Sequence, residues 1–592
     1  MTTKTIPSRL QAQGRQRPSH PAYAEKIGGR WQTTTWAKYA EQVRGAAKSL
    51  LEIGFDVGAT VCILGFNRPE WSVFNHAAMA LGGAGAGIYT TCSPEQVQYI
   101  IDHAEAEVVL LENSEQWAKV HERLSDLPRL KRVVFMKGAS ANHELCATWE
   151  EFMALGEARS DDEVYARIED LKPDQLATFI YTSGTTGPPK GVMLSHNALD
   201  WTANVAAELV GITERDCVVS YLPLSHIAEQ VFTLHGPAAN GYTAYYAESL
   251  EKLPENFKEV RPTILFAVPR IWEKFHAGIS AKMAAATGVK ASLARWAMTV
   301  GQRMAHHECR GEMPSGLLQL QYRIASRLVY SKVKAALGLD RLRFAVSGAA
   351  PISAEVLEFF SGLDIVIREV YGQSEDCGPT SFNRPGATRF GTVGPPVPGV
   401  DVRIAEDGEI LVKGPNLFMG YYKDDAATSE TLIDGWLHSG DLGRIDEEGF
   451  LHITGRKKEI IITAGGKNIA PKNIEGALKN HDLVAEAVVI GDRRKFLSAL
   501  LWLDNDAATA WAKAKGISAS ELHRSPLLRT ELDQYVKSSV NPRFHNVEQI
   551  KKFEILWEAL SVEAGELTPT LKVKRRIIDQ NYAQAIEGMY AN

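Results

Sequence analysis

The chain has 592 residues, which is too long for a single hydrophobic core, so we expect two or more domains. Hydrophobic residues make up 45% and charged residues 23% of the sequence, as in an ordinary soluble protein. A net charge of −6 gives no basic surface for nucleic acid, and six singly placed cysteines without a Cys-x-x-Cys pair argue against a structural zinc site.

Helical and strand patterns alternate through the first two-thirds of the chain, which predicts parallel sheets covered by helices. The N-terminus is polar and lacks a signal peptide, and no stretch reaches the ~18 apolar residues that span a bilayer. We therefore expect a cytoplasmic protein, for which peripheral contact with a membrane surface stays open. Hydrophobic spacing predicts helices at 39–53, 69–81 and 95–104, and strands at 60–64, 108–111, 177–182, 192–194, 262–268 and 342–346.

A glycine-rich run lies inside the longest apolar stretch, residues 77–88, and reads Gly82-Gly-Ala-Gly-Ala-Gly87. A dinucleotide-binding fingerprint follows a strand, whereas this run follows a helical pattern. We therefore interpret it as a closely packed loop.

The character of the sequence changes after Gly391. Runs of β-forming residues flank turn sequences at 406–408 and 446–449, which predicts two hairpins. From Arg456 onward the pattern is that of a separate α/β unit of about 135 residues. We place the boundary there and expect domains at 1–455 and 456–592.

The most informative stretch is the loop in Tyr181-Thr-Ser-Gly-Thr-Thr-Gly-Pro-Pro-Lys-Gly-Val-Met-Leu-Ser-His196. Its glycines expose backbone N–H groups, its hydroxyls add donors, and Lys190 adds a mobile positive charge for phosphate oxygens. A Walker A loop needs a helix directly after its lysine, whereas 192–194 reads as a strand. A bare hairpin turn would not need so many phosphate donors. The predicted phosphate-binding residues are Thr182, Ser183, Gly184, Thr185, Thr186, Gly187 and Lys190.

This loop resembles the phosphate-binding signature of adenylate-forming enzymes, which include acyl-CoA synthetases, luciferases and peptide-synthetase adenylation domains. The resemblance covers roughly residues 20–580. It implies an α/β fold, with a large N-terminal domain of two helix-covered sheets and a small β subdomain, followed by a small mobile C-terminal α/β domain.

A second motif, Glu369-Val-Tyr-Gly-Gln-Ser-Glu375, follows a predicted strand at 365–367. Tyr371 offers an aromatic face for adenine, and Glu375 a hard oxygen ligand for Mg²⁺. The resemblance implies these roles and a contact between Glu369 and the adenine amino group. Ala349 stands where many family members have glycine, which we interpret as a tolerated change. Further predicted nucleotide-site residues are Gly348, Ala349, Ala350, Gly372, Gln373 and Ser374.

A third motif, Asp434-Gly-Trp-Leu-His-Ser-Gly-Asp441, precedes Gly455-Arg456. The Asp441 carboxylate can accept both ribose hydroxyls, and the Arg456 guanidinium can reinforce that grip. A turn-capping role for Asp441 is the alternative. The similarity to the family's run at this place favours ribose binding.

Two more motifs concern the acyl group and the C-terminus. In Leu222-Pro-Leu-Ser-His226, a lone histidine would ordinarily be a packed core residue, whereas the resemblance puts His226 beside the reacting carboxylate. In the C-terminal run, the Lys-x-x-Arg-Arg spacing aligns Lys572 with the family's adenylation lysine, although Leu571 replaces the usual glycine. Lys574 is the local competitor and fits that spacing less well.

The resemblance also implies a two-step mechanism. Mg²⁺ near Thr186 and Glu375 would screen the pyrophosphate, while Lys572 bridges the fatty carboxylate and the α-phosphate. Rotation of the C-terminal domain about Lys458 would then withdraw Lys572. The same rotation would bring a turn to the site that admits the thiol of coenzyme A, formed by Gly465, Gly466 and Lys467.

Among the subgroups of the family, the amino-acid sequences of these motifs are most similar to those of long-chain acyl-CoA synthetases, including the bubblegum-type branch. The expected substrates are a fatty acid, ATP and coenzyme A, and the expected metal is Mg²⁺. Three alternatives stay open: a fatty acyl-AMP ligase that serves a carrier protein, a luciferase-like oxygenase, and a nucleotide sensor without catalysis. Acyl chain length and oligomeric state are open as well.

Overall fold

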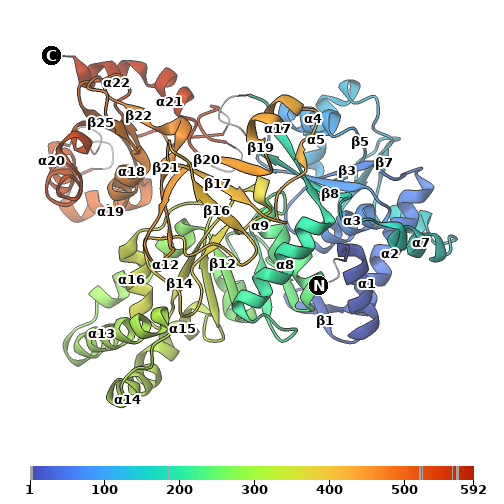
Figure 1. Ribbon diagram of the computed structural model, residues 1–592, viewed down its shortest axis with the longest axis horizontal. Helices are drawn as coiled ribbons and strands as arrows, with labels where there is room; N and C mark the ends of the chain where they lie inside the picture. Colours follow the sequence, from blue (N-terminus) through green and yellow to red (C-terminus); the bar gives the residue numbers. More distant parts are fainter. Residues whose placement is uncertain are drawn as a thin grey trace.

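The computed structural model describes residues 4–182, 187–518, 522, 525–562, 564–568 and 572–591. A large body carries most of the chain, and a smaller body follows it (Figure 1, orange to red). The main hydrophobic cluster of the large body ends at Leu451, and the clusters of the small body begin at Ile461. None of the hydrophobic clusters of the described residues spans both bodies.

An eight-stranded sheet forms the right half of the large body in Figure 1, in the order β18-β9-β8-β4-β3-β5-β6-β7. The six strands from β8 to β7 run parallel, and β9 and β18 run antiparallel to their neighbours. The strands are β3 (Thr60–Leu64), β4 (Ala84–Ile88), β5 (Ala106–Leu111), β6 (Arg132–Phe135), β7 (Cys146–Ala147), β8 (Leu176–Thr182), β9 (Lys190–Ser195) and β18 (Gly420–Tyr421).

Helices cover both faces of this sheet. Val61 and Ile63 share a hydrophobic cluster with α1, α2 and α3, whereas Cys62 and Leu64 share one with α4 and α5. The alternation of one strand's side chains between two clusters explains its uninterrupted apolar sequence. The helices are α1 (Ile6–Gln16), α2 (Trp36–Glu52), α3 (Pro69–Ala80), α4 (Pro94–His103), α5 (Ser114–Glu122), α6 (Trp149–Leu155), α7 (Asp162–Asp170) and α8 (His196–Val210).

The glycine-rich run at 82–87 is not a loop, so that prediction is wrong. Residues 84–88 form β4, in the middle of the sheet. A Cβ atom at Gly85 would lie 1.9 Å from Asn75 Oδ1, and one at Gly87 would lie 2.7 Å from Ser225 Cα. The strand lacks β-branched residues except at its end because neighbouring segments pack directly on its backbone.

Two four-stranded sheets form the rest of the helix-covered part, in the orders β10-β11-β1-β2 and β12-β13-β14-β15. The backbone N–H of Thr263 donates to the carbonyl of Cys217 (3.1 Å) and joins β10 to the start of β12. The strands are β1 (Pro21–Ile27), β2 (Arg30–Thr35), β10 (Cys217–Ser220), β11 (Thr243–Tyr246), β12 (Ile264–Ala267), β13 (Phe344–Ser347), β14 (Ile367–Tyr371) and β15 (Ser381–Phe382). The accompanying helices are α9 (Ile227–Gln230), α10 (Gly236–Asn240), α11 (Leu253–Val260) and α16 (Ala354–Gly362).

A helical extension leaves this part and points away from the rest of the molecule (Figure 1, lower left). It consists of α12 (Pro269–Ala284), α13 (Gly288–Arg310), α14 (Gly316–Ala325), a π-helical turn (Ser326–Tyr330) and α15 (Ser331–Leu337). The sequence analysis assigned no element to this segment.

The β subdomain is a five-stranded antiparallel sheet, and it confirms both predicted hairpins. Gly408 (φ +87°) and Gly449 (φ +86°) lie at their turns, in the left-handed conformation that favours glycine. The strands are β16 (Asp401–Ile404), β17 (Glu409–Lys413), β19 (Leu432–Ile433), β20 (Trp436–Ile445) and β21 (Leu451–Arg456), with α17 (Asp425–Thr431) beside them.

The small C-terminal body contains a three-stranded sheet, β24-β25-β26, and a two-stranded ribbon, β22-β23. Its strands are β22 (Ile461–Ile462), β23 (Asn468–Ile469), β24 (Val484–Ile490), β25 (Leu497–Leu503) and β26 (Ile550–Leu556), and its helices are α18 (Pro471–Lys479), α19 (Asn505–Lys515), α20 (Pro526–Tyr535), α21 (Arg575–Asn581) and α22 (Ala583–Tyr590). Asn480 Nδ2 (3.3 Å) and Arg543 Nη1 (3.4 Å) both contact the Glu355 carboxylate of α16, so the two bodies touch there.

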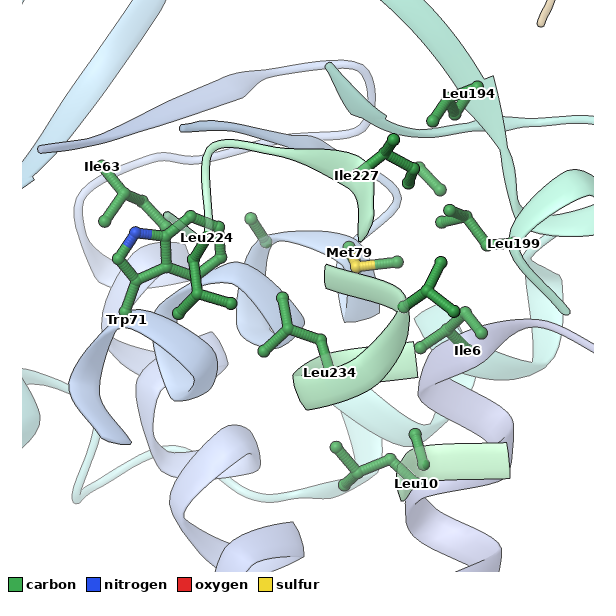
Figure 2. Packing of buried hydrophobic residues seen from close by; sticks show 14 of the residues in the cluster. Ile6, Leu10, Ile63, Trp71, Met79, Leu194, Leu199, Leu224, Ile227 and Leu234 are labelled. Atoms are coloured by element: carbon green, nitrogen blue, oxygen red, sulfur yellow. The ribbon is translucent and has the colours of Figure 1, made fainter. Parts of the chain in front are cut away.

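The core of the large body is built from segments far apart in the sequence. Figure 2 shows Leu224 beside Trp71 of α3 and Ile63 of β3, and Ile227 beside Leu194 of β9 and Leu199 of α8. This packing fixes the segment around residue 226 to the sheet. Within the described residues, none of the helices combines the length and the apolar character needed to cross a membrane.

Candidate active site

The phosphate-loop prediction falls between β8 and β9, which pair antiparallel up to Thr182 and Lys190. The predicted strand–loop–strand arrangement is therefore confirmed, and a Walker A loop is excluded. Gly187 has φ +130°, and no atom lies within 4 Å of a Cβ built there, so its backbone conformation rather than space selects glycine. Four residues of the prediction lie outside the described residues: Ser183, Gly184, Thr185 and Thr186.

Lys190 lies beside Tyr421, which connects it to the predicted metal ligand. Its Nζ is 3.1 Å from Asp424 Oδ2 and 4.9 Å from the centroid of the Tyr421 ring. The Tyr421 hydroxyl donates to Glu375 Oε1 at 2.8 Å. The sequence analysis missed Tyr421 and Asp424, because no local pattern links them to a loop about 230 residues earlier.

The predicted ribose residues form one hydrogen-bonded group. Asp441 and Arg456 are paired across β20 and β21, and Arg456 Nε donates to Asp441 Oδ1 at 2.9 Å. The Tyr371 hydroxyl donates to Asp441 Oδ2 at 2.9 Å. The carboxylate is thus held from two sides, which fixes its orientation. Gln373 Nε2 donates to the carbonyl of Ser439 (3.3 Å) and ties the second motif to the third.

The middle of β14 places Glu369 in a buried position, where the Gly391 N–H donates to its Oε2 (3.1 Å). Burial raises the pKa of Glu369 to about 8, so its carboxyl is largely protonated at pH 7 and can donate a hydrogen bond. A Cβ at Gly372 would lie 1.3 Å from the carbonyl oxygen of Gly378, which excludes any side chain at that position. Ser374 is buried beside them.

The other predicted adenine segment contains a strained residue. Ala349 has φ +67°, a conformation that costs an L-residue with a Cβ atom about 1–2 kcal/mol. The glycine common at this place in the family has a physical reason, and alanine is present here at an energetic cost. Ala349 and Ala350 are exposed, whereas Gly348 is buried against Val370.

His226 is half-buried at the N-terminus of α9, where its Nδ1 accepts from the Ala228 N–H (3.2 Å). Burial, with a smaller effect of the Lys572 charge, lowers the pKa of His226 to about 4. The imidazole is therefore neutral at pH 7 and can act as a donor or acceptor but not as a cation.

Two residues hold the segment before His226: Asn67, which the sequence analysis missed, and Glu229, which ends the motif around His226 but had no role assigned. Asn67 Nδ2 donates to the Leu222 carbonyl (2.7 Å) and to Ser220 Oγ (2.8 Å), and Asn67 Oδ1 accepts from the Leu224 N–H (3.3 Å). Ser220 Oγ in turn donates to Glu229 Oε1 (2.7 Å). Burial raises the pKa of Glu229 to about 8 although these donors favour its charged form. The network clamps residues 220–224 to the sheet.

Lys572 lies in the electrostatic neighbourhood of the site. Crowding by protein atoms, then the charges of Arg456 and Lys472, lower its pKa to about 8, against the opposing effects of Asp441 and Glu375. The residue is nevertheless exposed to solvent, so crowding by nearby protein atoms rather than enclosure lowers its pKa. The Thr568 N–H donates to the Lys572 carbonyl (2.8 Å), which fixes the backbone there.

The predicted pivot follows Arg456 by two residues, and the predicted thiol-side residues lie in a separate turn. Lys458 is exposed in the 3₁₀ turn Lys457–Glu459, between β21 and β22. Gly465, Gly466 and Lys467 form the exposed turn between β22 and β23, with a hydrogen bond from the Gly466 N–H to the Thr463 carbonyl (2.8 Å). Within the described residues, no hydrogen bond joins this turn to the nucleotide-site residues.

A family model described as "AMP-binding enzyme" matches residues 10–422, which contain most of the site described above. The chain belongs to the AMP-binding enzyme family. A second model, "AMP-binding enzyme C-terminal domain", matches residues 458–592 of this AMP-binding enzyme.

Curated relatives match over nearly the whole chain. A long-chain-fatty-acid–CoA ligase of Xenopus laevis is 38% identical over 603 residues, covering 96% of this chain and 81% of its own. One of Homo sapiens is 36% identical, covering 100% and 93%, and one of Mycobacterium tuberculosis is 36% identical, covering 97% and 95%.

Solved structures confirm the fold. The o-succinylbenzoate CoA synthetase of Bacillus subtilis, solved with an acyl-adenylate intermediate, superposes with a TM-score of 0.70 at 23% identity and covers 97% of this chain and 98% of its own. The adenylation domain of a carboxylate reductase from Mycobacterium chelonae gives 0.71 at 21% identity, covering 100% and 92%. The α/β architecture with a separate C-terminal unit is therefore that of an adenylate-forming enzyme.

Proposed function

We propose that this AMP-binding enzyme is an ATP-dependent long-chain fatty acid–CoA ligase. It would join a fatty carboxylate to AMP with release of pyrophosphate and then transfer the acyl group to the thiol of coenzyme A. The observation that carries the proposal is the environment of Lys572. Its ammonium group, in the C-terminal unit, interacts electrostatically with the Asp441 and Glu375 carboxylates of the large body. The curated relatives supply the substrate class.

The positions of the charged residues support the first step, the formation of the acyl-adenylate. A carboxylate that attacks the α-phosphate brings two anions together, so positive charge must be present where new charge develops. Lys572 would bridge the carboxylate and the α-phosphate, and Lys190 would contact the departing pyrophosphate. Asp441, held by Arg456 and Tyr371, would fix the ribose. The neutral His226 would position the carboxylate without adding charge.

Magnesium fits the residues that would hold it. Glu375 is half-buried with one carboxylate oxygen hydrogen-bonded to Tyr421, which leaves the other oxygen for a hard cation, and Thr186 would add a hydroxyl. When bound, the ion would neutralise charge on the phosphates. A structure of the o-succinylbenzoate synthetase with ATP and a magnesium ion is consistent with this assignment.

The second step would require the thiol to reach the acyl-adenylate at the place that Lys572 would occupy during the first step. We place the domain boundary at 455/456 and the pivot at Lys458, which is exposed and lies between the two cores. Rotation there would withdraw Lys572 and present Gly465, Gly466 and Lys467. The proposal also includes peripheral contact with a membrane, because a long-chain fatty acid partitions into lipid.

The test is pyrophosphate release from ATP with palmitate, measured with and without coenzyme A, together with palmitoyl-CoA formation. We expect slow release without coenzyme A, limited by retained acyl-adenylate, and fast continuous release with it. Acyl transfer only to a carrier protein, light emission with oxygen, or nucleotide binding without turnover would each replace the proposal with one of its alternatives.

A further inference from the structure

The outer face of α14 carries an apolar stripe. Five of the sixteen large hydrophobic residues that are exposed in the described part of the chain fall within residues 313–328. Leu317, Leu320, Ile324 and Leu328 are spaced three or four residues apart and lie on one side of the helix that runs from α14 into the π-helical turn, whereas Met313 lies in the non-helical segment just before α14. This α14 stripe consists of Met313 (86% exposed), Leu317 (69%), Leu320 (56%), Ile324 (44%) and Leu328 (41%).

The opposite face of α14 already has its partner. Leu318, Ala325 and Tyr330 are buried against Ala297 and Val300 of α13, and the Tyr330 hydroxyl donates to the Ala297 carbonyl (2.6 Å). The stripe is therefore not a core face that lacks its cover within the chain. It lies on the helical extension, which points away from the rest of the molecule (Figure 1).

The charged residues within and just after the stripe are basic, although Glu312 directly precedes Met313. Residues 313–339 contain four lysines and arginines and no aspartate or glutamate, although the whole chain has a net charge of −6. Arg323, Arg327 and Lys332 are exposed, and in the part of the chain that the structure describes no ion pair involves them. Lys334 is neutralised by Asp364. The free basic residues thus flank the apolar stripe.

We propose that the α14 stripe docks the protein on a membrane that contains anionic lipids. A helix with a large apolar face and a basic border lies in the interface plane, with aliphatic side chains among the acyl chains and basic groups among the headgroups. A symmetric pair of copies would instead bring two basic borders together, which their charge opposes. A membrane supplies both the apolar and the anionic component.

The test is binding of the full chain to vesicles, measured by co-flotation without substrates, so that its outcome is independent of the ligase assay. Wild-type protein should bind phosphatidylcholine vesicles that contain phosphatidylglycerol, more weakly those without it, and lose binding as salt rises. The double variant Leu317→Ser/Leu320→Ser should bind about tenfold more weakly or worse.

A matched control separates this surface from exposed leucines in general. Leu250 and Leu527 are 58% and 56% exposed and lie elsewhere, so Leu250→Ser/Leu527→Ser should leave vesicle binding within about twofold. Arg323→Gln/Arg327→Gln should weaken binding to anionic vesicles by roughly 30-fold at low salt, since each basic residue near such a surface contributes about 1 kcal/mol.

Two outcomes would overturn the proposal. One is equal vesicle binding by the wild type and the Leu317→Ser/Leu320→Ser variant. The other is a concentration-dependent dimer, seen by light scattering, that this variant abolishes, which would make the stripe an interface between copies. Unaltered far-ultraviolet circular dichroism and acyl-adenylate formation would verify that the variant folds.

Discussion

Replacing Lys572 with alanine should slow acyl-adenylate formation by about 10²-fold. A unit charge about 4 Å from another contributes about 4 kcal/mol at an effective dielectric of 20 and about 1 kcal/mol in bulk water. Lys572 is crowded by protein yet reaches solvent, so an intermediate value of about 3 kcal/mol applies, which corresponds to that factor.

The pH dependence gives an independent measure of the same charge. An amine is cationic below its pKa, so a pKa of about 8 leaves Lys572 about nine-tenths charged at pH 7 and about one-tenth charged at pH 9. The kcat/KM of the adenylation half-reaction, which reports on the free enzyme, should fall roughly tenfold between these values. Arginine stays charged throughout, so Lys572→Arg should remove that alkaline decline even if its rate at pH 7 is lower.

The two half-reactions must be assayed separately. Adenylation is followed by ATP–pyrophosphate exchange with palmitate, and thioester formation by adding coenzyme A to synthetic palmitoyl-adenylate. Lys572→Ala should lose the first activity and retain most of the second. An equal loss of both half-reactions, or an alkaline decline that persists in Lys572→Arg, would refute the assigned role.

Three further changes test other parts of the site. Lys458→Pro should spare adenylation but slow thioester formation by about 10²-fold or more, because proline fixes φ at the pivot. Lys458→Ala is the control for this variant. Normal coenzyme A turnover in the proline variant would count against the pivot. Asn67→Ala removes the hydrogen bonds to Leu222 and Leu224 and should lower the free energy of unfolding, measured by urea titration, by about 2–4 kcal/mol. A change below about 0.5 kcal/mol would contradict the clamp. Ala349→Gly should raise that free energy by about 0.5–1 kcal/mol, since the relief of left-handed strain exceeds the added chain entropy, and lower stability would show that no strain is present.

The sequence predicted best those elements whose signal is local. The strand at 60–64 is an unbroken apolar run and has these bounds in the structure, and the hairpin turns were marked by Gly408 and Gly449. Asp441 and Arg456 were assigned together from the resemblance to the family, and the structure shows that they are neighbours across paired strands.

Interactions between distant segments could not be predicted in the same way. Asn67 and Glu229 are ordinary polar residues in the sequence, and only the packing of the β3–α3 connection against α9 makes them a clamp. Tyr421 and Asp424 reach Lys190 because β18 adds to the edge of β9. The α14 stripe has a helical period typical of a buried face, so its exposure follows from the fold alone.

Gly87 of β4 determines how closely the segment around His226 approaches the eight-stranded sheet. At Gly87 the sheet carries only a hydrogen atom, and the backbone of Ser225, next to His226, occupies the room that a methyl group would need. The distance between the His226 segment and β4 is therefore set by direct backbone contact, without a side chain between them. An added methyl group at residue 87 would displace Ser225, and with it the neighbouring His226, from the sheet.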